Sequence, residues 1–510
     1  MNFIMNSFWN FDPLRHRQKL VRIIFLGIIL LALSLRTYNL TASPPGFYID
    51  EASNGYNAYS ILKTGRDEHG VKWPLFIRAF DDYRGGVFIY SLIPLIARKG
   101  LNIETVRLGA SIWGTLTVLL LFWLAKLMTN NITFSLLAAV ILALMPWHIH
   151  FSRIAHEAIV LPAAMIVIFG CWLKWLKGGK LLTGIGLTLV FWLSFFTYQT
   201  AKLWALLLAG LILFFNKKAV KKNWQLIWPW LIGGELILLS FWLWEKSFPG
   251  SLMTRTNQLA IWRDQPMFWE TIRRFSNNFI NHWGWQFLFN VGDLTYRSSS
   301  KVSSEMLASW AVFLIIGLGV IGKNLRKKPV WLVVGCLIVL FPLAASLTIT
   351  SPHAIRTIQA VPFFALAITL GMWWCLKKLK NKRMWLILFI VLSTGVIGVE
   401  FSHYYLDLID EYPKRVWMPQ HGFNGDLPTA ITQAYEKSIK ENKVLFLSDK
   451  IEQAYIQGLF FTKADPWLWQ TSRQALFTVA EFKDAQSNQV WVITRDECLQ
   501  KDRDYCVLTD

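Results

Sequence analysis

The chain has 510 residues, of which 54% are hydrophobic and only 16% are charged, and it contains 27 Trp and 36 Phe. This composition excludes a disordered chain and a purely water-soluble enzyme, and it indicates a membrane protein. The formal net charge of +20 would suit nucleic acid or an anionic surface. The position of the charges along the chain decides between these partners.

Several apolar runs are long enough to cross roughly 30 Å of hydrocarbon. We expect eleven membrane-spanning helices, at 21–38, 105–126, 133–147, 157–175, 181–197, 201–215, 225–244, 305–322, 330–349, 357–376 and 384–402. A twelfth apolar stretch, Gly86 to Ala97, is short and contains Pro94, so we predict that it lies in the membrane interface. The predicted fold class is therefore an α-helical polytopic membrane protein.

The basic residues fall on one predicted side of the membrane. With the N-terminus inside, the inner segments hold 21 Lys and Arg against one acid, Asp12. Short cytoplasmic loops retain Lys and Arg, so this asymmetry predicts a multi-pass plasma-membrane protein with a cytoplasmic N-terminus. The difference accounts for the whole net charge, and no nucleic-acid partner is expected. Treating 86–97 as a span would move three basic clusters to the outer face, which argues against it.

The predicted organisation has three parts. Residues 1–20 form a cytoplasmic N-terminus, 21–403 a transmembrane domain with large outer loops at 39–104 and 245–304, and 404–510 an extracytoplasmic α/β domain. The last part is predicted from a helix around Leu427–Glu441, strands at Val444–Leu447 and Val490–Thr494, and a short run at Asp504–Leu508. It has no glycine pattern for a nucleotide-sugar donor. Cys498 and Cys506 are either paired or free.

Acidic residues are concentrated in the first outer loop. Asp50 and Glu51 begin a short predicted helix, where carboxylates are electrostatically stabilised, so a purely structural role is one interpretation. Further acids follow at Asp67, Glu68 and Asp82. A group transfer also explains them, since a carboxylate can accept a proton from a hydroxyl while a cation holds a departing phosphate. A divalent-cation site built from carboxylates is the rival interpretation.

Polar residues also cluster at the outer ends of the predicted spans. Three His and Glu157 lie close together after the third span and suit either a zinc site or an interfacial belt with an Arg153–Glu157 pair. Tyr198 precedes Lys202, which we interpret as a lysine that extends to the interface. His353 and Arg356 are three residues apart after Pro352, so on a helix starting there both would face one phosphate.

The first loop resembles that of bacterial members of the dolichyl-phosphate-mannose protein mannosyltransferase superfamily, which is related to the aminoarabinose transferases of lipid A. The resemblance rests on Asp50-Glu51-Ala52, Gly55-Tyr56, the string from Ser60 to Gly70, and Pro74-Leu75. These proteins are multispan C-type (GT-C) glycosyltransferases with an acidic outer loop and helices along the membrane. This chain departs from them after Asp82-Tyr83-Arg84, where Gly85 and Gly86 stand in place of the two prolines that usually follow the basic residue.

The resemblance implies a site. Asp50 would be the catalytic carboxylate and Glu51 its supporting partner, while Arg84, His353 and Arg356 would bind the donor phosphate. Further residues are candidates for the substrate pocket: Asp67, Glu68, Asp82, Tyr83, Arg153, Glu157, Tyr198 and Asp293. No cofactor is required, although a divalent metal is compatible with the acids.

The expected function is inverting transfer of a sugar from a polyprenyl-phosphate donor to an extracytoplasmic acceptor, which can be a protein, a lipid or a glycan. A transporter or flippase of lipid-linked sugars is the first alternative. It would place charges in mid-span, where this sequence has only Glu235. A non-catalytic membrane scaffold is the second alternative, and it would not need Asp50, Arg84 and His353 to converge.

Overall fold

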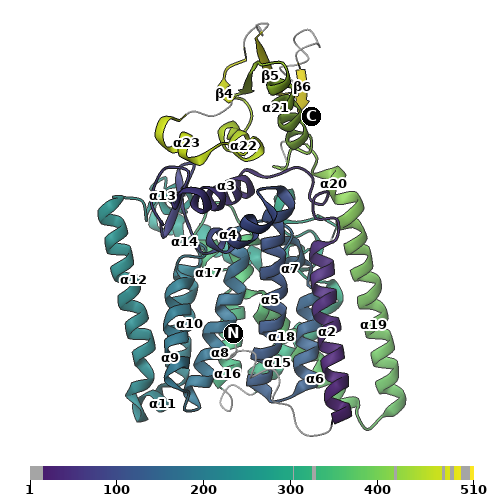
Figure 1. Cartoon of the computed structure of the whole chain (residues 1–510). Helices are drawn as coiled ribbons and strands as arrows, with labels where there is room; N and C mark the ends of the chain where they lie inside the picture. Colours follow the sequence, from purple (N-terminus) through teal and green to yellow (C-terminus); the bar gives the residue numbers. More distant parts are fainter. Residues whose placement is uncertain are drawn as a thin grey trace.

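The computed structural model describes residues 15–302, 304–323, 329–418, 422–473, 477–482, 488–494 and 506–509. A bundle of long helices carries a layer of short helices at one end, and a small α/β domain sits on that layer (Figure 1). Asp12 and most of the predicted cytoplasmic N-terminus lie outside the described residues.

Seven helical segments are long and apolar enough to cross a membrane. They contain α2 (Arg15–Thr37), α5 (Ile103–Thr129), α8 (Val160–Leu176), α12 (Trp228–Ser247), α16 (Pro329–Val339), α18 (Val361–Leu379) and α19 (Arg383–Leu406). Four shorter apolar helices complete the bundle, namely α6 (Ile132–Ala143), α9 (Leu181–Ser194), α10 (Ala201–Phe215) and α15 (Ala311–Lys323). Each helix falls on one of the eleven predicted runs. The polytopic helical fold is thereby confirmed, and the crossing of the four shorter helices stays a prediction.

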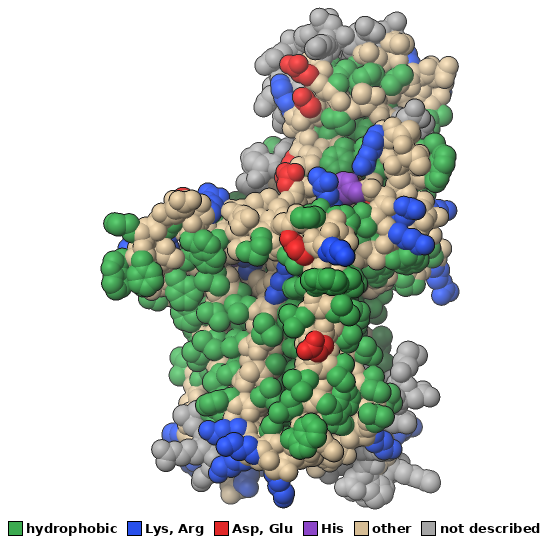
Figure 2. All heavy atoms as spheres, turned by 90° about the vertical axis from the view of Figure 1, so that its left-hand side faces the viewer, with side chains coloured by type: hydrophobic (Ala, Val, Ile, Leu, Met, Phe, Trp, Pro, Cys, Tyr) green, Lys and Arg blue, Asp and Glu red, His purple; other side chains and the backbone are tan. Residues whose placement is uncertain are grey.

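The outside of the bundle is apolar. Large side chains of α12 such as Leu238 and Trp242 are exposed, and hydrophobic side chains cover this face of the bundle in Figure 2. Lys and Arg gather at its lower end (Figure 2), and α11 (Lys217–Lys222) lies at the end opposite the C-terminal domain (Figure 1). The bundle therefore has the apolar belt and the basic end that the sequence predicts. Which side of the membrane the basic end faces stays a prediction.

The segment between α2 and α5, which is predicted to be the first outer loop, forms part of the layer above the bundle. It contains α3 (Ile49–Thr64), an antiparallel hairpin of β1 (Phe76–Ala79) and β2 (Asp82–Gly85), and α4 (Val87–Lys99), which occupies the predicted interfacial stretch. A Cβ on Gly85 would lie 2.1 Å from the carbonyl oxygen of Phe196. Glycine is therefore required where the hairpin meets the loop between α9 and α10. This close approach places the neighbouring Arg84 beside that loop.

The C-terminal domain has a parallel four-stranded sheet in the order β4-β3-β5-β6. Its elements are α21 (Leu427–Lys440), β3 (Val444–Ser448), α22 (Ala454–Phe461), α23 (Pro466–Ser472), β4 (Phe477–Ala480), β5 (Gln489–Thr494) and β6 (Cys506–Thr509). The predicted helix and the strands around 444 and 490 are confirmed, whereas α22, α23 and β4 were not predicted. The pairing of Cys498 with Cys506 lies outside the described residues.

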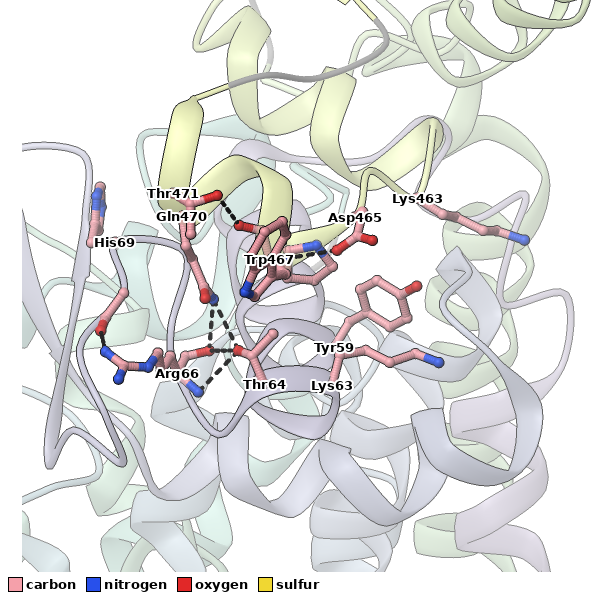
Figure 3. Close-up of a pocket in the computed structure, with 12 residues that line it drawn as sticks. Tyr59, Lys63, Thr64, Arg66, His69, Lys463, Asp465, Trp467, Gln470 and Thr471 are labelled. Atoms are coloured by element: carbon pink, nitrogen blue, oxygen red, sulfur yellow. Dashed lines mark hydrogen bonds between the residues drawn. The ribbon is translucent and has the colours of Figure 1, made fainter.

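The domain is fixed to α3 by specific contacts. The Tyr56 hydroxyl donates to the carbonyl of Ala464 over 3.1 Å, and the Gln457 amide donates to the carbonyl of Phe47 over 3.0 Å. At the other end of α3, the Gln470 amide of α23 donates to the Thr64 hydroxyl over 3.0 Å (Figure 3). These buried and half-buried hydrogen bonds hold the domain over the first outer loop.

Candidate active site

A cavity of about 480 Å³ lies where the layer of short helices meets the bundle. Its polar part includes Asp50, Arg84, His156, Glu157, Tyr198 and Arg356. Its apolar part includes Leu203 of α10, Phe241 of α12, and Leu252, Met253, Leu259 and Trp262 from the segment around α13 (Thr254–Leu259). Charged groups therefore face one region of the cavity and hydrocarbon side chains the other.

Asp50 and Arg84 form the closest ion pair in the cavity. One Asp50 carboxylate oxygen lies 2.6 Å from Nη2 of Arg84, which reaches it from β2. Burial alone would raise the pKa of Asp50, but Arg84, with His156 and Arg297, outweighs burial and holds that pKa below its usual value. Asp50 is therefore ionised at neutral pH. Nη1 of Arg84 is buried and has no hydrogen-bond partner within the described residues.

Three further groups surround the Asp50 carboxylate. His156 and Glu157 contact each other over 3.3 Å at the start of α8, and both line the cavity. Burial lowers the pKa of His156, and Glu157 opposes this shift. Arg297 lies over the ring of Tyr48 at 3.9 Å and acts electrostatically on Asp50. A neutral imidazole and a fixed guanidinium therefore stand near the carboxylate.

Glu51 points away from this cavity. Its side chain is 0% exposed, and its two oxygens accept from Nε and Nη2 of Arg107, each over 2.9 Å. Arg107 also donates to the carbonyls of Leu40, Pro44 and Gly46. Glu51 thus fixes the turn that leads into α3, and through that turn it positions Asp50.

Arg356 lines the cavity at the entry to α18. The expected helix after Pro352 begins later, as the 3-10 turn η6 (Ile355–Ala360). Nη1 of Arg356 donates to the hydroxyls of Thr348 and Thr350, each over 2.6 Å, and Tyr198 acts electrostatically on Arg356. The guanidinium is therefore held in a fixed direction on the cavity wall.

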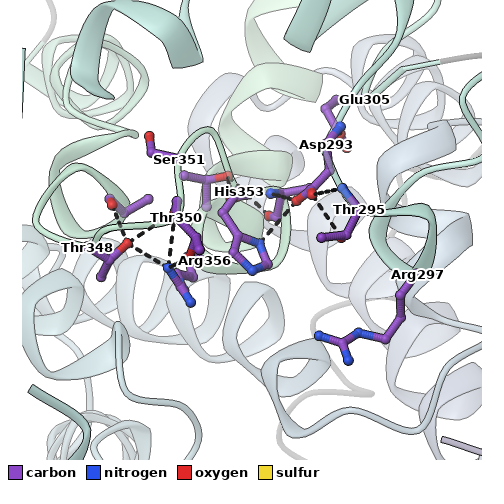
Figure 4. A network of polar contacts seen from close by, with 12 residues as sticks. Asp293, Thr295, Arg297, Glu305, Thr348, Thr350, Ser351, His353 and Arg356 are labelled. Carbon is purple, nitrogen blue, oxygen red and sulfur yellow. Dashed lines mark hydrogen bonds and ion pairs between the residues drawn. The ribbon is translucent and has the colours of Figure 1, made fainter. Parts of the chain in front are cut away.

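His353 belongs to a neighbouring network. Its Nδ1 lies 3.1 Å from an Asp293 oxygen, which also accepts from the backbone N–H of Ala354 over 2.6 Å. Figure 4 shows the imidazole between the side chains of Arg356 and Arg297. Burial lowers the pKa of His353 and Asp293 opposes this shift. Asp293 thus acts on His353 and does not line the cavity itself.

The remaining predicted residues have structural neighbours. The carboxylate of Asp67 accepts from the N–H groups of His69 and Val71, and Glu68 accepts from the amide of Asn57 over 3.3 Å. The ring of Tyr83 packs edge-on against Trp244. Arg153 is buried and donates to backbone carbonyls, among them that of Ser43 over 2.8 Å.

The structure therefore brings together part of the predicted set. Six residues line the cavity, namely Asp50, Arg84, Arg356, Asp82, Glu157 and Tyr198. Seven do not, namely Glu51, His353, Asp67, Glu68, Tyr83, Arg153 and Asp293. His156, Lys202 and Arg255 line it without having been selected. Lys202 could have been selected from the sequence, because it is a cation at the predicted outer end of a span, against the general charge bias.

The metal interpretations receive no support from the geometry. Within the described ranges, no three His, Cys, Asp or Glu side chains converge as a metal site would require. Of the three histidines considered, His148 contacts Arg36 over 3.0 Å and His150 contacts the carbonyl of Arg297 over 2.8 Å. Only His156 faces the cavity.

The fold of the chain is similar to that of solved C-type glycosyltransferases. ArnT from Cupriavidus metallidurans bound to undecaprenyl phosphate is similar, with a TM-score of 0.53 and 11% identity over 94% of each chain. The Archaeoglobus fulgidus oligosaccharyltransferase gives a TM-score of 0.57 and 10% identity over 90% of this chain and 64% of its own. The archaeal enzyme AglB of that organism, in complex with an inhibitory peptide and a dolichol-phosphate, gives 0.53 and 12% over 87% and 64%. The sequence matches no protein-family model and no curated protein.

Proposed function

We propose that the chain is a membrane glycosyltransferase that moves a sugar from a polyprenyl-phosphate donor to a hydroxyl acceptor at the outer face of the plasma membrane. The main support for this proposal is the cavity, which has one polar and one apolar side. The Asp50–Arg84 pair faces a wall of apolar side chains from α10, α12 and the α13 segment. The similar solved proteins bind undecaprenyl phosphate or a dolichol-phosphate, which supports this donor class.

The charges of the cavity suit a phosphate. Arg84, Lys202, Arg255 and Arg356 line it, against the acids Asp50, Asp82 and Glu157. A phosphate diester adds one negative charge, which the additional cation neutralises. The unpartnered Nη1 of Arg84 and the fixed guanidinium of Arg356 supply charge-assisted donors. The apolar wall then accommodates the first units of the hydrocarbon chain at the level of the bundle.

The proposed reaction is a single displacement. The acceptor oxygen attacks the anomeric carbon, its proton passes to Asp50, and the bond from that carbon to the phosphate oxygen breaks. The electron pair leaves with polyprenyl phosphate, and the configuration inverts. Because the pKa of Asp50 is low, the carboxylate accepts the proton late, when the new C–O bond has already made the hydroxyl acidic.

The donor site is tested by binding polyprenyl phosphate, the proposed leaving group, to the purified chain in nanodiscs. Replacing Arg356 by Ala removes a charge-assisted donor of about 1.5–3 kcal/mol, so affinity should fall by about 10- to 100-fold. Arg356→Lys should recover only part of this, since an ammonium lacks the planar fork. Arg78→Ala, an exposed arginine on β1, is the matched control. If both Arg356 variants bind polyprenyl phosphate as the parent does, the phosphate does not bind at this site.

A further inference from the structure

A second cavity opens at the other end of α3. Its volume is about 880 Å³, and its walls come from the end of α3, the following turn, and α23 of the C-terminal domain (Figure 3). Lys63 lies thirteen residues after Asp50 on the same helix, which corresponds to about 20 Å. The two cavities share no lining residue. This cleft, which we call the α3–α23 cleft, is therefore separate from the proposed transfer site.

The walls of the α3–α23 cleft are fixed in relation to each other. The Gln470 amide nitrogen donates to the Ser60 hydroxyl over 2.8 Å, the Thr64 hydroxyl over 3.0 Å and the Asp67 carbonyl over 2.9 Å. These bonds join α23 to the end of α3 and to the turn that follows it, and Figure 3 shows the bond to Thr64. A preformed cleft costs a ligand little reorganisation.

An aromatic ring stands open in the cleft. Trp467 is 60% exposed, and its main chain is held at the start of α23, where its backbone N–H donates to the Asp465 carboxylate over 2.8 Å. Tyr59 projects from α3 on the same cleft (Figure 3). The remaining lining is mainly polar. A flat apolar ring within a polar rim matches a sugar, whose ring presents C–H groups on its faces and hydroxyls at its edge.

The cleft is also basic. Lys63, Arg66 and Lys463 line it, against the single carboxylate of Asp465. Arg66 donates to the carbonyl of Gly70, and Lys63 lies 5.7 Å from the ring centre of Tyr59. In the ranges that the structure describes, no carboxylate forms an ion pair with any of these three cations. The excess positive charge calls for an acidic ligand.

We propose that the α3–α23 cleft binds an acidic saccharide. α3 and α23, which form the walls of the cleft, lie on the side that carries the C-terminal domain and away from the apolar bundle (Figure 1), which favours a water-borne ligand over a membrane lipid. The exposed Trp467 favours a sugar ring over an acidic peptide. This binding does not depend on the proposed transfer reaction.

The test is a titration of the full chain in nanodiscs with tetragalacturonic acid, with neutral maltotetraose and tetraglutamate as comparison ligands. We expect saturable binding of the acidic sugar and binding of the neutral sugar that is weaker by about tenfold. Trp467→Ala should weaken acidic-sugar binding by about tenfold, and Lys463→Glu by about fivefold. Raising the salt from about 0.1 M to about 1 M should weaken it further, because the screening length falls from about 10 Å to about 3 Å.

Matched controls separate the cleft from general surface effects. Trp269→Ala changes a tryptophan that is 75% exposed on α14 (Phe268–His282), and Lys440→Glu reverses an exposed charge at the end of α21. Neither should alter binding. Three results would each overturn the proposal. The first is that the acidic sugar shows no saturable binding up to about 10 mM, and the second is that maltotetraose binds equally well. The third is that tetraglutamate binds and that Trp467→Ala does not weaken its binding.

Discussion

Glu51 and Asp50 are neighbours in sequence, but we expect different consequences when each is replaced. Replacing Glu51 should lower stability, whereas replacing Asp50 should mainly lower transfer. Removing the Glu51 carboxylate leaves the guanidinium of Arg107 buried without its counter-ion, and it also removes the acceptor of the Ala155 N–H. Breaking a buried pair in this way costs about 3–5 kcal/mol. Arg107 retains three carbonyl acceptors, so we expect Glu51→Ala to fall near the lower end of that range.

The assay is the midpoint of thermal aggregation of purified variants, measured beside polyprenyl-phosphate binding. Glu51→Ala should aggregate at a clearly lower temperature, while Asp50→Asn should lower that temperature much less, because asparagine keeps an oxygen that can accept from Arg84. The double variant Glu51→Gln with Arg107→Met removes both charges and should recover part of the loss, because the two effects are not additive. A Glu51→Ala protein with parental stability would refute the structural role of Glu51.

Three further predictions concern other parts of the molecule. Burial raises the pKa of Glu68 to about 8, so at neutral pH the folded state holds a proton that the unfolded state has lost. The free energy of unfolding should therefore fall as the pH rises from about 4.5 to about 8. Glu68→Gln should make the aggregation midpoint depend less on pH. Gly85→Ala should displace the β1–β2 hairpin from Phe196 and abolish polyprenyl-phosphate binding, whereas Gly186→Ala, which has open space around it, should not. Single cysteines at the exposed positions Lys72, Leu294 and Lys437 should be labelled by an impermeant reagent from outside, and one at the exposed Ala219 only from inside; labelling at Leu294 from inside would reverse the topology.

Apolar periodicity and charge asymmetry were sufficient to predict the bundle, because lipid requires long apolar helices with their backbone groups paired internally. The hairpin at 76–85 was missed because its two strands have four residues each. They depend on the close approach of Gly85 to Phe196, which only tertiary structure provides. The short helices α22 and α23 were likewise not evident from their pattern.

The site was predictable in its parts. The acids of the first loop and the cations at span ends indicated Asp50, Arg84 and Arg356, which the fold brings to one cavity. Adjacent helical residues differ in direction by about 100°, but sequence could not show that Asp50 is the one that faces the cavity and Glu51 the one that faces Arg107. Nor could it show that Asp293 acts on His353, because sixty residues separate them.

The most direct test of the central proposal uses a strain from which the gene is deleted. This strain is compared with three complemented strains, which carry the parental gene, the Asp50→Asn gene or the Asp449→Asn gene as an exposed control. The lipid-linked sugars and envelope glycans of each strain are measured by mass spectrometry. Loss of the base should lower transfer by about 100-fold or more, so the Asp50→Asn strain should lack one sugar-modified envelope component and accumulate its polyprenyl-phosphate donor, as the deletion does. An Asp50→Asn protein that is inserted normally and restores the parental glycan profile would contradict the proposal.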